Sequence, residues 1–335
     1  MSTTELSLNA IYDLAHACLT SAGADRANAD AIANTVMTAE RDGSHSHGLF
    51  RIPGYVASLR SGKVNGESDP KVNARTSVVL HCDGDMGYAP LALARSYEPL
   101  AEAASKHGLA VLSLTRSFHF AALWPEVEAM AERGLVGLSC VSYKPVVAPA
   151  GAREPLFGTN PLAFAWPRPG GSPVVYDMAT AARAMGDVQI AARDGHSVPP
   201  GTGLDADGNE TTDPAEILKG VLLPFGGYKG SAVAMMVELL AGAMVGETFS
   251  YESAARDNND GGPAQGGQFL LALSPEKISG RDWASQSEAF FQRMGGMDGV
   301  RLPGERRHRN RLDEGPRAVN AALVEKIIEL TADGD

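Results

Sequence analysis

The sequence predicts an α/β fold preceded by a helical N-terminal segment. Two observations support this: from about residue 76 onward, short apolar runs typical of buried strands alternate with helical patterns, whereas earlier residues show only helical spacing. With 335 residues, 44% of them hydrophobic, the chain is long enough for one large or two ordinary domains. We expect a helical segment over residues 1–70, an α/β domain over 71–300 and a C-terminal segment over 301–335 that packs back on the core.

The N-terminal segment contains three predicted helices. An apolar stripe at helical spacing covers Ile11–Leu19, and Gly23 can end that helix. A second stripe covers Ile32–Met37. The third helix is expected around Ile52–Leu59, because Pro53 is tolerated in a first helical turn.

In the α/β part, short apolar runs indicate strands, and longer stretches rich in Leu and Ala indicate helices. The expected strands are Val78–Cys82, Leu109–Leu114, Leu135–Val141, Leu162–Trp166, Val174–Asp177 and Phe269–Leu273. The expected helices are 90–106, Pro125–Arg133, Ser231–Val245 and a closing Ala318–Leu330. Leu204–Asp213 resembles a calcium loop, but its glycine is misplaced and the closing Glu is missing, so it predicts a β-hairpin turn.

Composition excludes several classes of partner. A net charge of −11 and a pI of about 5.2 argue against nucleic-acid or anionic-membrane binding. No apolar run approaches the length of a bilayer span, and no secretory signal is present. Cys18, Cys82 and Cys140 are widely spaced and fit no metal or disulfide framework. We therefore expect a cytoplasmic protein without a metal site.

The polar segment between the second and third helices is the most informative part of the chain. His47 and Arg51 are four residues apart, so they lie near one another if the chain is helical from Leu49 onward. A histidine can transfer a proton near neutral pH, and an arginine can bind a carboxylate through two parallel hydrogen bonds. The pair suits a small anionic substrate. The alternative is a polar loop whose Ser44 or Ser46 caps the next helix.

Other candidate sites are weaker when taken singly. No Gly-x-Gly-x-x-Gly fingerprint follows a predicted strand, and Gly226–Gly230, with Lys229, is either a phosphate-binding loop or a plain glycine turn. His119 follows a strand, where ligand sites gather in α/β proteins, but it could equally be a core histidine. Gly158–Pro161 offers a threonine hydroxyl or simply forms a turn. Asp187 could orient a histidine or lie solvated at the surface.

Taken together, these segments resemble the malate/L-lactate dehydrogenase family that is unrelated to the Rossmann lactate dehydrogenases. The matching motifs are Ser46–Gly48, His119–Phe120, Gly158–Pro161, Asp177–Thr180, Asp205–Pro214 and Leu223–Gly230. Within this family the chain looks most like the Δ1-piperideine-2-carboxylate/Δ1-pyrroline-2-carboxylate reductases. The features are Arg41–Gly48, Phe120–Pro125, Gly186–Arg193 and Arg301–Arg307. In the hydroxyacid members a lysine commonly stands where this chain has Asp187.

The resemblance implies a non-Rossmann NAD(P)-binding domain with a largely antiparallel or mixed sheet flanked by helices. It also implies a homodimer that uses NADPH to reduce the cyclic imines to L-pipecolate and L-proline. His47 would be the proton donor with Ser46 and Asp187 as relay partners, while Arg51 and Thr159 would hold the substrate carboxylate. Contacts with NADPH are implied for His119, Phe120, Ala121, Ala122, Leu123, Asp177, Met178, Ala179, Lys229, Gly230, Arg301, Leu302, Pro303, Gly304, Glu305, Arg306 and Arg307.

Two rival functions use the same residues. The first is an NAD(P)-dependent 2-hydroxyacid dehydrogenase of the malate or lactate type, and the second is a non-catalytic relative. Asp187 in place of lysine argues against the first, and the retained His47 and Arg51 argue against the second. Tyr143–Pro145 and Arg183–Met185 depart from the pattern expected of the close relatives, and we expect both segments to line the substrate pocket.

Overall fold

The centre of the protein is a seven-stranded mixed sheet with the strand order β2-β3-β4-β11-β5-β6-β7. The computed structural model describes residues 2–334. Among the sheet's neighbours only β3 and β4 run parallel, and the other pairs are antiparallel. The strands are β2 (Lys71–Ala74), β3 (Val79–Tyr88), β4 (Leu109–Phe118), β5 (Val136–Val141), β6 (Leu162–Trp166), β7 (Val174–Met178) and β11 (Gln265–Leu273). The predicted largely antiparallel α/β fold is confirmed.

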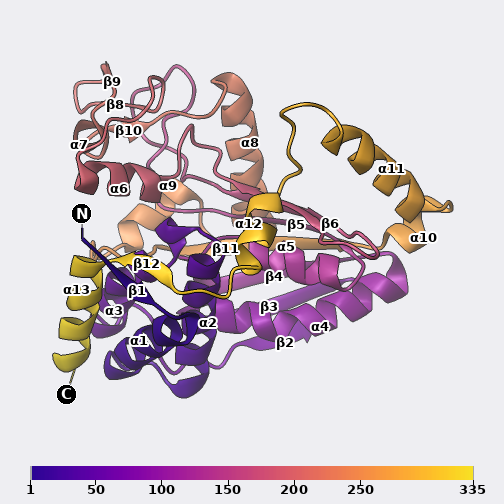
Figure 1. The fold of residues 1–335 in the computed structure, drawn as a ribbon, viewed down its shortest axis with the longest axis horizontal. Coiled ribbons are helices and arrows are strands. Elements are labelled where there is room, and N and C mark those ends of the chain that lie inside the picture. The colour runs from indigo at the N-terminus through magenta and orange to yellow at the C-terminus, as the bar shows by residue number, and fades with distance from the viewer. Residues whose placement is uncertain (1, 335) are drawn as a thin grey trace.

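Helices cover both faces of this sheet because successive residues of each strand point to opposite sides. On one face, Leu112 and Leu114 of β4 join a core with α4 (Ala89–His107) and α5 (Trp124–Glu132). On the other face, Val111 of the same strand packs with residues of a second helical layer. That layer consists of α8 (Tyr228–Glu238) and its π-helical continuation η3 (Leu239–Met244). Figure 1 shows α8 and α4 on opposite sides of the strands.

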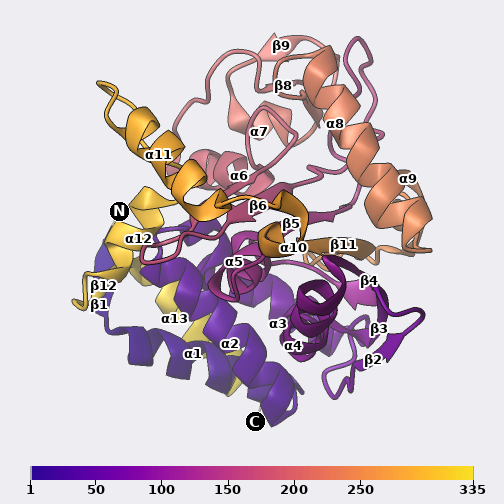
Figure 2. The ribbon, with the colours of Figure 1, turned by 90° about the vertical axis from the view of Figure 1, so that its right-hand side faces the viewer.

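The N-terminal helices form a separate cluster with the C-terminal helix. Its elements are α1 (Leu8–Ser21), α2 (Arg26–Arg41), α3 (Ile52–Arg60) and α13 (Ala321–Ala332). Ser7 and Asp25 cap α1 and α2 by accepting hydrogen bonds from backbone N–H groups. β1 (Thr3–Leu6) pairs with β12 (Arg317–Asn320), so the strand at the start of the chain lies beside the strand that precedes α13, as Figures 1 and 2 both show.

Of the remaining elements, α6, α7 and β8–β10 lie at the upper left of Figure 1, whereas α10 and α11 lie at its right. The predicted turn between residues 204 and 213 is confirmed, because β8 (Gly203–Leu204) pairs with β9 (Glu210–Thr211) as a hairpin. The others are α6 (Met185–Asp194), α7 (Pro214–Ile217), β10 (Val221–Leu222), α9 (Ser250–Ser253), α10 (Pro275–Ser279), α11 (Trp283–Gly295) and α12 (Glu305–Arg311). None of the helices in residues 2–334 combines the length and apolar character needed to cross a bilayer.

Two expected helices are present, and the start of a third is wrong. Helix α3 begins at Ile52, as expected, and the preceding Leu49–Arg51 forms a 3₁₀ turn. The expected Ser231–Val245 helix changes from α to π geometry at Leu239. Ala318–Asn320 is strand instead of helix, because it pairs with β1 at the other end of the chain, and a local pattern cannot reveal that contact.

Candidate active site

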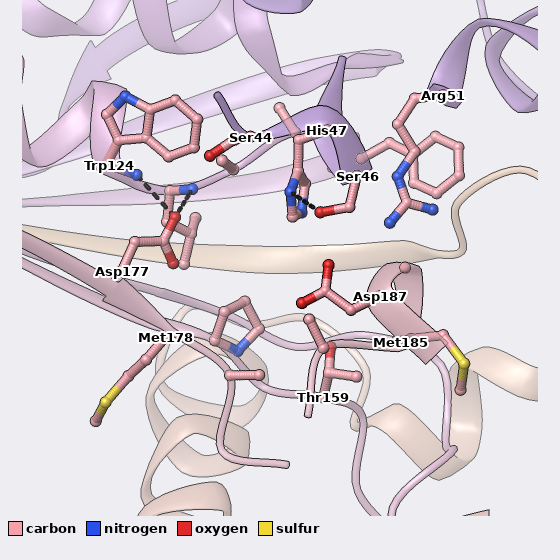
Figure 3. A pocket seen from close by; sticks show the side chains of 18 of the residues that line it. Ser44, Ser46, His47, Arg51, Trp124, Thr159, Asp177, Met178, Met185 and Asp187 are labelled. Atoms are coloured by element: carbon pink, nitrogen blue, oxygen red, sulfur yellow. Dashed lines mark hydrogen bonds between the residues drawn. The ribbon is translucent and has the colours of Figure 1, made fainter. Parts of the chain in front are cut away.

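A cavity of about 450 Å³ opens where the loop between α2 and α3 faces the ends of β4 and β7. Helix α6 and the start of α12 complete its walls. The cavity collects most of the predicted site residues from segments far apart in the sequence (Figure 3). Those lining it are Ser46, His47, Arg51, His119, Phe120, Ala121, Ala122, Leu123, Thr159, Asp177, Met178, Ala179, Asp187, Arg306 and Arg307.

Two groups of predicted cofactor residues do not line this cavity. Lys229 and Gly230 lie in the first turn of α8, and Lys229 is exposed. Their loop is nevertheless adjacent to a cavity wall, since Phe225 N–H donates to the Thr180 carbonyl at 3.0 Å. The stretch from Arg301 to Glu305 leads into α12, and only the following two arginines reach the cavity.

Glu40, at the end of α2, holds the loop that carries the catalytic candidates. Its carboxylate accepts a hydrogen bond from the Leu49 N–H at 2.8 Å and contacts Nδ1 of His45 at 2.6 Å. Gly48 must be glycine here, because a Cβ at that position would lie 2.0 Å from Glu40 Oε1. These contacts fold His45–His47 into a tight 3₁₀ turn that presents the next side chains to the cavity.

His47 is paired with the neighbouring serine and is electrically neutral at ordinary pH. Ser46 Oγ lies 3.2 Å from His47 Nδ1. Burial, together with the nearby Arg51 and His119 side chains, lowers the pKa of His47 to about 3. Neither Ser44 nor Ser46 caps the following 3₁₀ turns with its side chain, so the helix-capping alternative is wrong.

Arg51 is held for planar anion recognition. Its guanidinium carbon lies 4.5 Å from the ring centroid of Phe120, an arrangement that favours a cation. Burial lowers the pKa of Arg51, although Tyr143, Tyr55 and Asp187 oppose the shift. Its Nε is buried and has no hydrogen-bond partner within residues 2–334. A buried cationic donor of this kind fits an arriving carboxylate.

Asp187 and Thr159 face the histidine loop from the opposite wall. Figure 3 shows the Asp187 carboxylate pointing from the first turn of α6 toward Ser46 and Arg51. Thr159 is fixed through its carbonyl, which accepts hydrogen bonds from the N–H and the hydroxyl of Thr180, both at 2.9 Å. The cavity therefore brings together all five residues predicted for proton transfer and substrate binding.

The other end of the cavity carries an acid and two arginines. Asp177 accepts hydrogen bonds from the N–H groups of Leu123 at 2.7 Å and Trp124 at 3.1 Å, while desolvation raises its pKa to about 6. Arg307 lies over the Trp124 ring at 5.1 Å from its centroid, and Arg306 also lines the cavity. The aromatic ring and the two arginines fit a nicotinamide dinucleotide with its phosphates.

His119 lies between these two ends. Its Nε2 contacts Oε1 of the buried Glu126 at 2.9 Å, and Gln268 donates to the same oxygen at 3.2 Å. This network fixes the imidazole ring beside the cavity. His119 is therefore both a buried, hydrogen-bonded histidine and a residue that lines the cavity, and its contact with a ligand stays a prediction.

The cavity also contains residues that the sequence pattern either flagged or missed. Tyr143 and Met185 line it, as expected for both atypical segments, whereas Lys144 and Arg183 do not. Ile190 was missed because it reaches the cavity only through α6, a helix whose small residues hid the helical spacing. No cluster of His, Cys, Asp and Glu that could hold a metal occurs within residues 2–334.

Known proteins resemble the chain over nearly its whole length. The sequence matches the malate/L-lactate dehydrogenase family over residues 6–327. It is 49% identical over 290 residues to a Δ1-pyrroline-2-carboxylate/Δ1-piperideine-2-carboxylate reductase of Pseudomonas putida, covering 86% of this chain and 85% of that relative. A Δ1-pyrroline-2-carboxylate reductase of Ancylobacter novellus is 42% identical over 327 residues, which is 96% of either chain.

A solved structure also resembles this chain over nearly its whole length. A crystal structure of Δ1-piperideine-2-carboxylate reductase from Pseudomonas syringae pv. tomato superposes with a TM-score of 0.92 at 44% identity, covering 98% of this chain and 100% of that one. The fold and the cavity thus define an oxidoreductase of the nicotinamide-dependent class. More particularly, the chain belongs to the malate/L-lactate dehydrogenase family.

Proposed function

We propose that the protein uses NADPH to reduce Δ1-piperideine-2-carboxylate and Δ1-pyrroline-2-carboxylate to L-pipecolate and L-proline. The observation that carries the proposal is the meeting of His47, Arg51 and Asp187 in one cavity, in a chain whose relatives are named as these reductases. Arg51 and Thr159 hold the carboxylate of the imine. His47 faces the ring nitrogen as the proton donor, and Ser46 and Asp187 orient and recharge it.

Each side chain has one role in this scheme. The bound cofactor supplies a hydride to the carbon of the C=N bond, and one proton must reach the nitrogen. A proton on the imine nitrogen lowers the energy needed to add hydride to the neighbouring carbon. Arg51 keeps the carboxylate in place from imine to amine, so the reacting carbon does not move away from the cofactor side of the cavity.

Substrate binding itself prepares His47 for its task. The positive charge of Arg51 is one cause of the low pKa of His47 in the free protein. A carboxylate on Arg51 neutralises that charge, so the pKa of His47 rises when substrate arrives. Burial, the largest cause of the low pKa, remains in the complex, so substrate binding raises the proton affinity of His47 only by the part that the Arg51 charge had removed.

NADPH is proposed over NADH because Arg306 and Arg307 add two positive charges to one end of the cavity. Arginines bind the extra 2′-phosphate of NADPH bidentately, and a solvated basic tail would not line a cavity. Replacing Arg306 and Arg307 together by alanine should raise the KM for NADPH about tenfold more than that for NADH. Equal losses for both cofactors would mean that these arginines do not read the 2′-phosphate.

The decisive assay follows NADPH oxidation with Δ1-piperideine-2-carboxylate, Δ1-pyrroline-2-carboxylate, pyruvate and oxaloacetate at equal concentrations. We expect turnover with the two imines to exceed turnover with the two oxoacids by at least about a hundredfold. That factor is the lower end of the rate gain from one correctly positioned acid or base. Faster turnover of the oxoacids would establish the 2-hydroxyacid dehydrogenase alternative instead. Absence of turnover with all four substrates would favour a non-catalytic relative.

We further propose that the protein is a homodimer. Helix α8 and η3 expose an apolar face along the outer edge of the molecule in Figure 2, and contiguous exposed apolar surface marks protein contacts. Its members are Tyr228, Met235, Met236, Leu239 and Met244. Sedimentation equilibrium should give twice the 35.1 kDa chain mass, and replacing Leu239 by Lys should lower it toward the monomer.

Two broader proposals concern location and organisation. Burial of the free thiols of Cys18, Cys82 and Cys140 supports residence in the reducing cytoplasm. We also propose that residues 1–70 act as a segment carrying the catalytic histidine, 71–300 as the NADP-binding domain, and 301–335 as a segment that packs back. The contact of α13 with α1 and α3 supports this division, which limited proteolysis can test.

A further inference from the structure

A buried cluster of charges lies outside the residues assigned so far. Arg311, the last residue of α12, donates hydrogen bonds to both oxygens of Asp42 at 2.6 to 3.0 Å. The same guanidinium donates to both oxygens of Glu128 at 2.7 and 2.8 Å. Asp42 also accepts from Arg41 at 2.8 Å, and Nδ1 of His308 lies 3.8 Å from Glu128. Both carboxylates are buried.

The cluster joins three walls of the active-site cavity. Asp42 immediately precedes Gly43, the first cavity-lining residue of the histidine loop. Glu128 belongs to α5, whose first residue is the cavity-lining Trp124. Arg311 ends the short helix that carries the two cavity-lining arginines. One guanidinium thus connects three distant segments. Asp42 and Glu128 are 86 residues apart in the sequence, and Glu128 and Arg311 are 183 residues apart.

Helix α12 depends on such polar ties because it has little else to hold it. None of its seven residues is buried, and a helix of two turns is not stable by itself. Its other attachments include Arg307 Nη2, which donates to the Val175 carbonyl at 2.7 Å, and Asn310 Nδ2, which donates to the Asp42 carbonyl at 3.0 Å. His308 Nε2 also lies 2.8 Å from the Pro173 carbonyl, and the Arg307 guanidinium lies over the Trp124 ring. Removing charged groups from water costs free energy, and this cost offsets much of the attraction between them. A buried ionic cluster therefore fixes the relative positions of its residues but adds little to the free energy of unfolding.

We propose that Arg311 is a positioning residue that holds α12 in place, so that Arg306 and Arg307 face the cofactor end of the cavity. This inference rests on the proposed role of those two arginines in binding NADPH. Desolvation would raise the pKa of Asp42, but hydrogen bonds from Arg311 and Arg41 outweigh it and hold that pKa below its ordinary value. Asp42 is therefore charged at neutral pH, as the tie requires.

The test compares Arg311→Met with a matched control, Arg168→Met. Arg168 also makes two charged hydrogen bonds to one carboxylate, that of Glu288, both at 2.9 Å. Its side chain is 23% exposed and that of Arg311 is 20% exposed, but Arg168 does not line the cavity. Glu288 is 37% exposed, whereas Asp42 and Glu128 are buried, so Arg168→Met controls for the loss of a paired arginine, and Arg311→Met is expected to lower the free energy of unfolding more.

We expect Arg311→Met to raise the dissociation constant of NADPH about tenfold or more, the effect of one displaced charge-assisted contact. Turnover at saturating NADPH should stay within about threefold of wild type, because Glu40 holds the histidine loop independently. Arg168→Met should leave both quantities unchanged. An unchanged NADPH affinity in Arg311→Met, or equal losses in the two variants, would overturn the proposal.

Two further measurements keep the outcome decisive. If Arg311→Met does not fold, Arg311→Lys keeps the charge without the planar fork, and the same rise in the NADPH dissociation constant is expected. Hydrogen exchange of the backbone amides of residues 305–311 is measured without any cofactor, and exchange should accelerate in the Arg311 variants only. This readout answers the positioning question even if the wild-type protein reduces none of the imines. Unchanged exchange would show that α12 is held by other contacts.

Discussion

Replacing Gly186 by alanine should separate activity from stability. Gly186 lies in the first turn of α6, where a Cβ would come within 2.7 Å of Arg51 Nη2 and 3.1 Å of Ser46 Cβ. Ordinary van der Waals contact begins at 3.4 Å, so the added methyl group must displace the end of the Arg51 side chain by about 0.7 Å. Alanine also favours the helix over glycine by about 1 kcal/mol.

A shift of this size costs one of the two parallel hydrogen bonds to the substrate carboxylate, about 1.5–3 kcal/mol. We therefore expect kcat/KM for the imine to fall about 10- to 100-fold, while the free energy of unfolding in urea stays equal or rises. Gly295→Ala is the control, because its Cβ meets nothing within 4 Å in α11 and activity should be unchanged. Wild-type kcat/KM in Gly186→Ala would refute the assignment of Arg51 as the carboxylate site.

Further predictions concern His47 and Arg51. His47→Ala should lower turnover about 10²- to 10⁴-fold with little change in the dissociation constant of NADPH, and near wild-type turnover would rule out its role as donor. Arg51→Lys should raise the KM for the imine strongly while the protein remains folded, since lysine lacks the planar fork; an unchanged KM would place the carboxylate elsewhere. Because the pKa of His47 falls to about 3 in the folded protein, its contribution to stability is complete above pH 6.5 and is lost as the pH falls. Between pH 7 and pH 5 the wild type should lose up to about 2 kcal/mol more unfolding free energy than His47→Gln, and equal losses would contradict the low pKa.

Local sequence patterns were sufficient for much of the fold. Most of the expected strands and helices exist, because their apolar spacing is set by the layer that each element packs against. Contacts between distant segments were not accessible in this way. β12 exists only because Thr3–Leu6 pairs with it, and no pattern within residues 317–320 announces that partner.

The candidate site shows the same division. His47 and Arg51 were found because both stand in one short segment and their chemistry is distinctive. The groups that hold them were not found: Glu40 looks like an ordinary surface acid in the sequence, yet it is buried and bonded to the histidine loop. Gly186 was noted only as part of a resemblance, since a close approach between backbone and side chain leaves no periodic signal.

The N-terminal cluster needs segments from both ends of the chain, so it cannot be complete until synthesis reaches β12 and α13. Helices α1 and α3 are complete by residue 60, but α13, which packs against both, begins at Ala321. At a synthesis rate of about 5–20 residues per second, roughly 13 to 52 s separate the two events. Throughout that interval the apolar sides of α1 and α3 that α13 will cover have no partner, so the helical cluster that carries His47 can be completed only after α13 has been made.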